Sequence, residues 1–328
     1  MAELNGVVAG PPVIGLVVPC YNEEAILPSS ARRLRSKLAQ LVDDGLAAQG
    51  SRIYLVDDGS DDRTWRLITE LVSGDPAFAG IRLARNYGHQ YALYAGLMEA
   101  EGDALISLDA DLQDDIDVID AMLAEFRAGK QIVYGVREDR RSDTLFKRVT
   151  ASLHYGLLSR MGVKTVHHHA DFRLMSRMAV DFLSEYREAN LYLRGIVPLL
   201  GLESGIVPYR RQEREAGTTK YSLGRMLGLS VQGLTSFSIV PLRIISGLGL
   251  VVFVIASLLG LWALYASFTV PDTVPGWAST VIPIYLLGGL QLLAIGVAGE
   301  YIGKTFIESK RRPLYQVAQR LGMSDRGA

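Results

Sequence analysis

The chain has 328 residues with 34 basic and 35 acidic side chains, a net charge of −1 at pH 7, and one cysteine. This length allows one large domain of roughly 100 to 200 residues plus an appendage, and the balanced charge gives no global field that would attract nucleic acid, so no nucleic-acid partner is expected. The single cysteine, Cys20, excludes an internal disulfide framework and a thiolate metal cluster, and it fits a reducing, cytoplasmic setting.

The first ten residues carry one charge, Glu3, and lack the basic region and long apolar stretch of a secretory signal. We therefore expect the domain that follows to stay in the cytoplasm. Short runs rich in Val, Ile and Leu predict strands at 13–18, 53–56, 81–84, 104–108 and 132–136. Amphipathic stretches between them predict helices at 27–42, 64–72, 89–100 and 116–126. This alternation predicts an α/β fold with a mainly parallel sheet and helices on both faces.

Polar clusters follow the predicted strands, where ligands bind on sheets of this kind. They occupy residues 19–24, 57–62, 85–88 and 109–113, and Arg137 follows the fifth strand. A G-x-G-x-x-G after the first strand and a P-loop are both missing from the sequence, so a nucleotide must be held in another way.

The sequence Asp109-Ala-Asp111-Leu-Gln113 is the strongest candidate site for a metal ion. On an extended segment one carboxylate can bind a cation directly, while the other approaches it through water or a ribose hydroxyl, and Gln113 adds a neutral oxygen. Oxygen-only ligands favour Mg²⁺ or Mn²⁺, which usually also bind substrate phosphates. The ordinary alternative is a set of solvated carboxylates that cap the next helix, and it describes Asp114, Asp115 and Asp117 well.

Basic residues further along the chain are expected to return to the same edge, where guanidinium groups suit phosphate oxygens. They are Arg137, Arg173, Arg210, Arg211, Arg214 and Lys220. Residues 214–221 contain glycine and hydroxyl side chains, which allow a loop that folds over a diphosphate. The alternative for any one of these cations is contact with anionic lipid.

The last third of the chain carries two apolar segments of membrane-spanning length, 244–268 and 277–299. Basic residues flank the pair on its outer ends, which places both ends of this hairpin, 241–304, on the cytoplasmic side. The segment 221–240 is apolar but interrupted by polar residues, so it predicts helices lying in the membrane interface, or alternatively an amphipathic packing helix. Residues 305–328 are expected to form a cytoplasmic tail. A buried helical pair within a soluble domain is the alternative for the hairpin.

Several motifs together resemble one enzyme family. They are Pro19-x-Tyr21-Asn22-Glu23, Asp57-Asp58-Gly59-Ser60-x-Asp62, Asp109-Ala-Asp111-Leu-Gln113, Asp171-Phe-Arg173-Leu and the segment 214–221. This combination resembles the family-2 glycosyltransferases with a GT-A fold, and within them the polyprenyl-phosphate glycosyltransferases of the bactoprenol glucosyltransferase and dolichyl-phosphate mannose synthase type. The similarity covers nearly the whole chain, so residues 1–220 are expected to form the Rossmann-like GT-A catalytic domain.

The resemblance implies roles for individual residues. The residues that hold the base and ribose would be Pro19, Tyr21, Glu23, Asp57 and Asp58, with Ala110 beside the nucleotide. The metal and diphosphate motif would be Asp109, Asp111 and Gln113, and the phosphate-binding cations would be Arg137, Arg214 and Lys220. Asp171 matches the acidic residue near the acceptor, often proposed as a base. The histidines before it, 167–169, depart from the family pattern; like His89 and His154 they are interpreted as ordinary exposed or packed residues, not as a metal site.

The implied reaction is attack of a lipid phosphate on the anomeric carbon of a nucleotide sugar, with inversion. We expect one sugar, glucose as the first candidate, to pass from a UDP-sugar to undecaprenyl or another polyprenyl phosphate at the cytoplasmic membrane face, and related enzymes suggest a homotetramer. Asp171→Asn is expected to keep measurable activity, whereas Asp111→Ala should lose nearly all of it. The alternatives are a processive polysaccharide synthase, whose Gln-x-x-Arg-Trp motif the sequence lacks, and an inactive membrane scaffold, against which the intact acidic motif argues.

Overall fold

The computed structural model describes residues 10–137, 169–188, 191–209 and 277–323, together with scattered helical positions between 245 and 265. The chain divides into two compact units. The first contains residues 1–159, 164–220 and 313–328, and the second contains residues 160–163 and 221–312. The C-terminal residues therefore belong to the same unit as the N-terminal domain.

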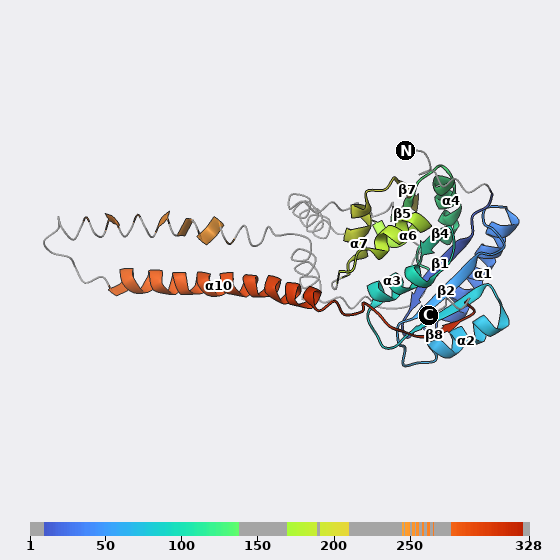
Figure 1. Ribbon diagram of the computed structural model, residues 1–328, viewed down its shortest axis with the longest axis horizontal. Helices are drawn as coiled ribbons and strands as arrows, with labels where there is room; N and C mark the ends of the chain where they lie inside the picture. The colour runs from blue at the N-terminus through green and yellow to red at the C-terminus, as the bar shows by residue number, and fades with distance from the viewer. Residues whose placement is uncertain are drawn as a thin grey trace. The chain divides into compact units, whose positions relative to one another are not determined.

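In the described residues the first unit is built on one sheet of eight strands, in the order β7-β5-β6-β4-β1-β2-β3-β8 (Figure 1). The strands are β1 (Ile14–Cys20), β2 (Arg52–Asp57), β3 (Phe78–Leu83), β4 (Ala104–Ser107), β5 (Ile132–Arg137), β6 (His169–Ser176), β7 (Ser204–Tyr209) and β8 (Val317–Leu321). Pairing is parallel across β4-β1-β2-β3 and between β5 and β7. Because β6 and β8 run antiparallel to their neighbours, the sheet is mixed.

Helices follow the strands of the N-terminal half in regular alternation. They are α1 (Leu27–Asp43), α2 (Thr64–Gly74), α3 (His89–Glu99), and the short 3₁₀ turn η1 (Ile116–Val118) that leads into α4 (Ile119–Arg127). Further along the chain come α6 (Arg177–Ser184), α7 (Leu193–Ile196) and η2 (Val197–Leu200). All four predicted helices and all five predicted strands are confirmed, with bounds that differ by a few residues.

Both faces of the sheet are covered, which explains why β1 is buried along its whole length. Alternate residues of this strand, Ile14, Leu16 and Val18, join the core formed with α1, α2 and α4. Val17 points to the opposite face, where α3 lies so close that a Cβ at Gly96 would come within 2.4 Å of the Val17 side chain. This close approach brings the N-terminus of α3 to the carboxyl edge of the sheet.

Strand β6 is the main departure from the predicted sheet. It lies between β4 and β5 and runs antiparallel to both, whereas the sequence predicted a mainly parallel sheet. The Ser107 hydroxyl at the end of β4 donates to the backbone carbonyl of Asp171 on β6. The insertion carries Asp171 and Arg173 into the middle of the sheet.

The predicted tail, residues 305–328, also differs from expectation. Helix α10 (Trp277–Ser309) continues into this range, and residues 317–321 form the edge strand β8 beside β3. A bidentate ion pair between Arg320 and Glu99 of α3, at 2.9 and 3.0 Å, fixes this strand to the rest of the first unit. Part of the tail is therefore a structural element of the sheet.

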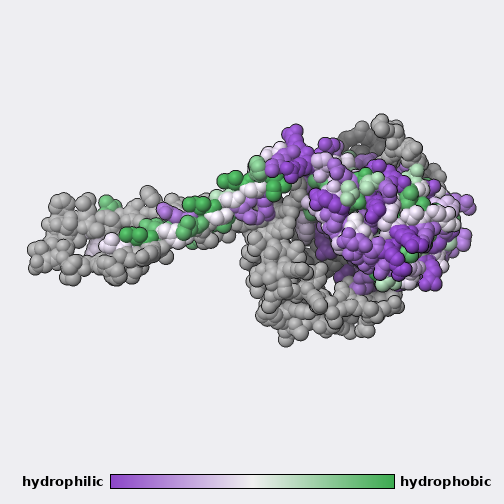
Figure 2. All heavy atoms as spheres, turned by 90° about the horizontal axis from the view of Figure 1, so that it is seen from below, coloured by the Kyte–Doolittle hydropathy of each residue, from purple (hydrophilic) through white to green (hydrophobic). Residues whose placement is uncertain are grey.

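In the second unit, α10 includes the whole of the predicted segment 277–299 and contains Pro283. Among the described residues, no helix combines the length and apolar character that a membrane crossing requires. Large apolar side chains of this unit are nevertheless exposed, as Figure 2 shows along α10. They include Ile284, Leu292, Ile295, Ile302 and Phe306. The predicted interfacial helices, 221–240, and much of the segment 244–268 lie outside the described residues.

Candidate functional site

The polar loops meet at one edge of the sheet because β1, β2 and β4 run parallel and end there. The loops after β1 and β2 are tied together by side-chain hydrogen bonds. The Ser60 hydroxyl accepts from the Asn22 amide at 3.0 Å, and the Thr64 hydroxyl accepts from the Glu23 amide at 2.9 Å. Asn22 has a φ of 54°, a left-handed conformation that Asn tolerates better than most residues. This turn directs the first loop toward the second.

Three carboxylates from two loops crowd together at this edge. Burial raises the pKa of Glu23 to about 7, and the charges of Asp111, Asp62 and Asp109 add to the rise. Burial likewise raises the pKa of Asp109, while His89 offsets part of the effect. Repulsion of this kind between like charges is relieved by a cation. The arrangement therefore favours binding of a positively charged group by Glu23, Asp109 and Asp111.

Gln113 supplies a further oxygen beside these acids. Its Oε1 atom is buried and has no hydrogen-bond partner among the described residues, while its backbone amide donates to Asp111 Oδ1 at 3.3 Å. An unpaired buried acceptor is costly unless a ligand satisfies it. In the described ranges no group of three or more His, Cys, Asp or Glu residues forms a ready metal site. Because Mg²⁺ uses few protein ligands and completes its shell with water and phosphate, the donors present still fit such an ion.

Asp171 lies on β6 in a pocket of guanidinium and amide groups. It is 8% exposed, and its carboxylate accepts from Arg173 at 2.6 Å, from Arg194 at 3.0 and 3.2 Å, and from the Gln90 side chain at 3.3 Å. The two arginines hold the pKa of Asp171 well below its usual range despite the burial. Such a carboxylate is a weak base, so this geometry suits orientation better than proton abstraction.

His89 joins the two halves of the site. At the N-terminus of α3, its Nε2 atom lies 3.6 Å from Asp109 Oδ1 and 3.8 Å from Asp171 Oδ2. His89 is exposed, as the sequence led us to expect, but it also lies near both carboxylates of the site. Its position directly after the polar loop 85–88 was the signal, because residues at the start of that helix share the edge with the other loops.

Arg137 is located at this edge but is engaged by protein groups. Its guanidinium donates to Asp114 Oδ1 at 3.1 Å and to the Tyr209 hydroxyl at 3.0 Å, and Tyr209 donates to the same Asp114 oxygen at 2.7 Å. Asp114 is 3% exposed, so its interpretation as a solvated capping residue is wrong. Asp115 does cap the following turn, since its side chain accepts from the Asp117 amide at 3.0 Å. Asp114 instead positions Arg137.

Arg173 was predicted to bind phosphate, and the structure contradicts this. The residue is 1% exposed, and its guanidinium bonds to Asp171 and to the Leu193 carbonyl. The reason is the antiparallel insertion of β6, which points Arg173 into the interior, where a substrate phosphate cannot reach it. Arg173 instead contacts the Asp171 carboxylate.

The residues predicted to hold the nucleoside surround the ends of β1 and β2. Pro19 is buried within β1, Ala110 is buried and accepts from the Ser30 hydroxyl at 2.7 Å, and Tyr21 is 43% exposed at the surface. Asp57 is fully buried, 3.4 Å from the Arg82 guanidinium. Asp58 accepts from the Tyr87 and Gly88 amides at 2.8 and 2.9 Å, so it fixes the third polar loop.

Comparison with known proteins agrees with this geometry. The model for "Glycosyl transferase family 2" matches residues 16–183. The uncharacterized glycosyltransferase YkoT of Bacillus subtilis is 47% identical over 93% of this chain and 91% of its own length. The prophage bactoprenol glucosyl transferase homolog of Escherichia coli is 39% identical over 92% of this chain and 97% of its own. The chain belongs to glycosyl transferase family 2.

Two further similarities complete this comparison. The bactoprenol glucosyl transferase of Shigella phage SfV is also 39% identical over 92% of the chain and 97% of its own length. Among solved structures, the mannosyltransferase PcManGT of Pyrobaculum calidifontis, in complex with GDP-Man and Mn²⁺, shares 16% identity with a TM-score of 0.45, covering 90% of this chain and 88% of that one. The resemblance to family-2 transferases, and to bactoprenol glucosyltransferases among them, is thereby confirmed.

Sequence reasoning missed three residues of this transferase that the fold brings to the site: His89, Gln90 and Arg194. Gln90 bridges two elements, because its side chain donates to Asp171 and accepts from the Leu193 amide at 3.1 Å. Arg194 follows on α7, far from any strand end in the sequence. The predicted cations Arg210, Arg214 and Lys220 lie outside the described residues, as do Arg211, His154, His167 and His168.

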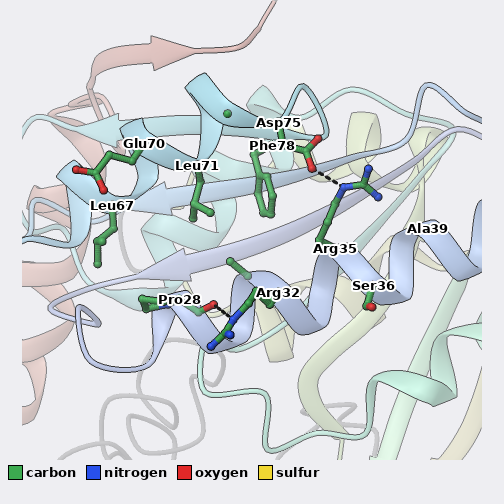
Figure 3. Close-up of a pocket in the computed structure, with 12 residues that line it drawn as sticks. Pro28, Arg32, Arg35, Ser36, Ala39, Leu67, Glu70, Leu71, Asp75 and Phe78 are labelled. Atoms are coloured by element: carbon green, nitrogen blue, oxygen red, sulfur yellow. Dashed lines mark hydrogen bonds and ion pairs between the residues drawn. The ribbon is translucent and has the colours of Figure 1, made fainter.

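A separate groove of about 740 Å³ lies between α1 and α2 of the transferase (Figure 3). It is lined mainly by apolar atoms, and an ion pair of 2.6 Å joins Arg35 of α1 to Asp75 at the end of α2. None of the predicted site residues lines this groove. The chemistry of the carboxyl edge therefore does not extend into it.

The raised pKa of Glu23 gives a prediction that does not depend on activity. In the metal-free protein we expect this carboxyl to titrate near pH 7, and we expect Mg²⁺ or Mn²⁺ to lower the midpoint because a cation offsets the charges of Asp109 and Asp111. Ionised Glu23 is disfavoured in the fold, so its contribution to stability is fully present below the ordinary value of 4.5 and lost as pH rises through about 7. Carboxyl-resolved NMR titration with and without Mg²⁺ measures both midpoints.

The control for this titration is Glu23→Gln, which should remove the resonance and flatten the dependence of thermal stability on pH between about 4.5 and 7. A midpoint that Mg²⁺ leaves unchanged would show that no cation binds beside Glu23.

Proposed function

We propose that this transferase moves a single sugar, glucose in the first instance, from a UDP-sugar to undecaprenyl or another polyprenyl phosphate at the cytoplasmic face of the membrane, with inversion at the anomeric carbon and with Mg²⁺ or Mn²⁺ as cofactor. The supporting similarity is the alignment over more than nine tenths of the chain with proteins named bactoprenol glucosyl transferases. The supporting geometry is the position of His89, whose side chain lies between the carboxylates of Asp109 and Asp171 and within 4 Å of both.

The acidic loop suits the donor. A nucleoside diphosphate is an anion that binds beside carboxylates only when a cation lies between them, and Asp109, Asp111 and Gln113 offer the oxygen ligands for it. A bound divalent ion would stabilise the charge that develops on the departing diphosphate. The carboxylate of Glu23, on the loop after β1, would face the same cation.

The other half of the site suits the acceptor. A phosphate monoester has a second pKa near 6, so the attacking oxygen is already largely deprotonated at neutral pH and requires no strong base. This agrees with a carboxyl at Asp171 whose pKa is lowered by Arg173 and Arg194. Arg194 is partly exposed while it binds Asp171, so we assign Arg194 to binding of the acceptor phosphate. Asp171 would orient Arg194.

Membrane attachment is part of the same proposal. The segments 244–268 and 277–299 carry no Asp, Glu, Lys or Arg, and exposed apolar side chains occur in both. Examples are Leu258, Leu261, Trp262 and Tyr265 in the first and Ile284, Leu292 and Ile295 in the second. Apolar surface of this extent needs a lipid or protein neighbour. A polyprenyl phosphate acceptor would itself lie at the bilayer surface.

The direct test uses the purified full-length protein in detergent with undecaprenyl phosphate and a panel of UDP- and GDP-sugars. We expect UDP-glucose with Mg²⁺ to give one lipid product, heavier than the acceptor by a single hexose, with the anomeric configuration opposite to that of the donor. Mass spectrometry and NMR of the product measure both. A chelator should stop the reaction, and added Mg²⁺ should restore it.

Each other outcome points elsewhere. Polymeric products would identify a processive synthase. If no donor sugar is consumed with any acceptor, the protein would be an inactive membrane scaffold. Transfer of a different sugar would retain the reaction but replace glucose.

A further inference from the structure

The strand after α10 borders the nucleotide side of the catalytic edge. Strand β8 pairs with β3 so that Gln319 lies opposite Arg82, and the Ala84 amide donates to the Gln316 carbonyl at 2.9 Å. Directly opposed residues of an antiparallel pair point to the same face, so the Gln319 side chain shares the face of Arg82. Arg320 points the other way and pairs with Glu99 on α3. The orientation of Gln319 is therefore fixed by the pairing.

A polar pocket of about 560 Å³ opens beside this residue. Its walls come from the ends of β1, β2 and β3 and from Ala318 and Gln319 of β8. The loop after β2 can approach the loop after β3 because residue 59 is glycine: its φ is +68°, and a Cβ there would lie 2.5 Å from the Arg85 backbone. The volume falls within the range of small-ligand sites, about 300 to 1,000 Å³.

The strand order places this pocket next to the acidic residues of the site, and the two do not overlap. The acids follow β1 and β4, whereas the pocket lies at β2, β3 and β8, and the sheet runs β4-β1-β2-β3-β8. A ligand across this edge would meet carboxylates at one end and, at the other, a pocket with charged side chains of both signs, Asp61, Arg82 and Arg85, and the exposed ring of Tyr21. A nucleoside diphosphate has this division, with its charge at one end and a flat, hydrogen-bonding base at the other.

We infer that β8 completes the base-binding subsite of the donor and that Gln319 hydrogen-bonds the edge of the base. This inference rests on the proposed function, because it takes the donor to be a nucleoside diphosphate sugar. A carboxamide offers one acceptor and two donors, so it can pair at once with an N–H and a neighbouring C=O, the pattern at the edge of uracil and guanine. The C-terminal strand thus contributes to donor recognition from more than 230 residues beyond β3 in the sequence.

The test compares Gln319→Ala with Gln316→Ala in the full-length protein by calorimetry. Gln316 is the same residue type on the same segment, and only its backbone is bonded to the sheet, so its replacement is the matched control. With Mg²⁺ present we expect Gln319→Ala to weaken binding of UDP, or of GDP if that is the nucleotide bound, about 5- to 20-fold. Binding of inorganic pyrophosphate, which has no base, should be unchanged.

Kinetics provide a second measurement. Loss of a contact made equally before and during reaction should raise KM for the donor and leave kcat and KM for the acceptor unchanged. Unchanged nucleotide affinity in Gln319→Ala, or equal weakening for nucleotide and pyrophosphate, would overturn the inference while leaving the proposed function in place. A wild-type protein that binds neither UDP nor GDP would overturn both.

Discussion

Replacing Asp111 by alanine is expected to lower the rate of sugar transfer at least about 10² to 10³-fold while leaving the protein folded. Asp111 is exposed, and the charge it places beside Glu23 and Asp109 is repulsive in the metal-free protein. Its removal should therefore cost little stability, roughly within 0.5 kcal/mol. The loss should fall on cation binding and on stabilisation of the leaving diphosphate.

Two measurements separate this effect from a general loss of charge. Titration with Mn²⁺, followed by paramagnetic relaxation of water, should show much weaker binding in Asp111→Ala. The matched control is Asp43→Ala, which removes an exposed aspartate at the far end of α1 and should retain both cation binding and activity. Full activity in Asp111→Ala would remove the acidic loop from the mechanism.

Replacing Asp171 by asparagine is expected to destabilise the protein by about 3 to 5 kcal/mol, because the change strands the buried charge of Arg173. Arg173 is 1% exposed, and its ion pair with Asp171 is 2.6 Å long. The pKa of Asp171 is lowered in the fold, so its contribution is present above the ordinary value of 3.8 and lost as pH falls toward the lower folded value. The difference between variant and wild type should therefore be constant from about pH 5 to 8 and shrink in acid.

Thermal unfolding of the full-length protein in detergent measures the destabilisation. The double variant Asp171→Asn, Arg173→Met removes the stranded charge and should recover more than half of the lost stability. Activity per folded molecule should remain measurable in Asp171→Asn, because an orienting carboxylate contributes less than the acidic loop. Complete loss of activity in a folded Asp171→Asn protein would instead identify Asp171 as an essential base.

The first half of the catalytic unit could be predicted from the sequence because its signals are local. Each of β1 to β4 is a short run rich in apolar residues, and each is followed by polar residues and a helix. The type and the boundaries of these elements are therefore set by residues next to one another in sequence. Parallel pairing then places Glu23, Asp57 and Asp109 at a common edge without further information. The acidic cluster was therefore predictable from its sequence alone.

What only the tertiary structure decided concerns residues whose partners lie far along the chain. An antiparallel β6 between β4 and β5 made Arg173 a buried partner of Asp171, and burial turned Asp114 from an expected capping residue into a support for Arg137. His89 became part of the site through the packing of α3, and Gln319 through the return of β8 to β3. Charge and periodicity describe a residue and its neighbours in sequence. Whether a charge meets solvent, a counter-ion or a ligand depends on strands that pair with partners far away in the sequence.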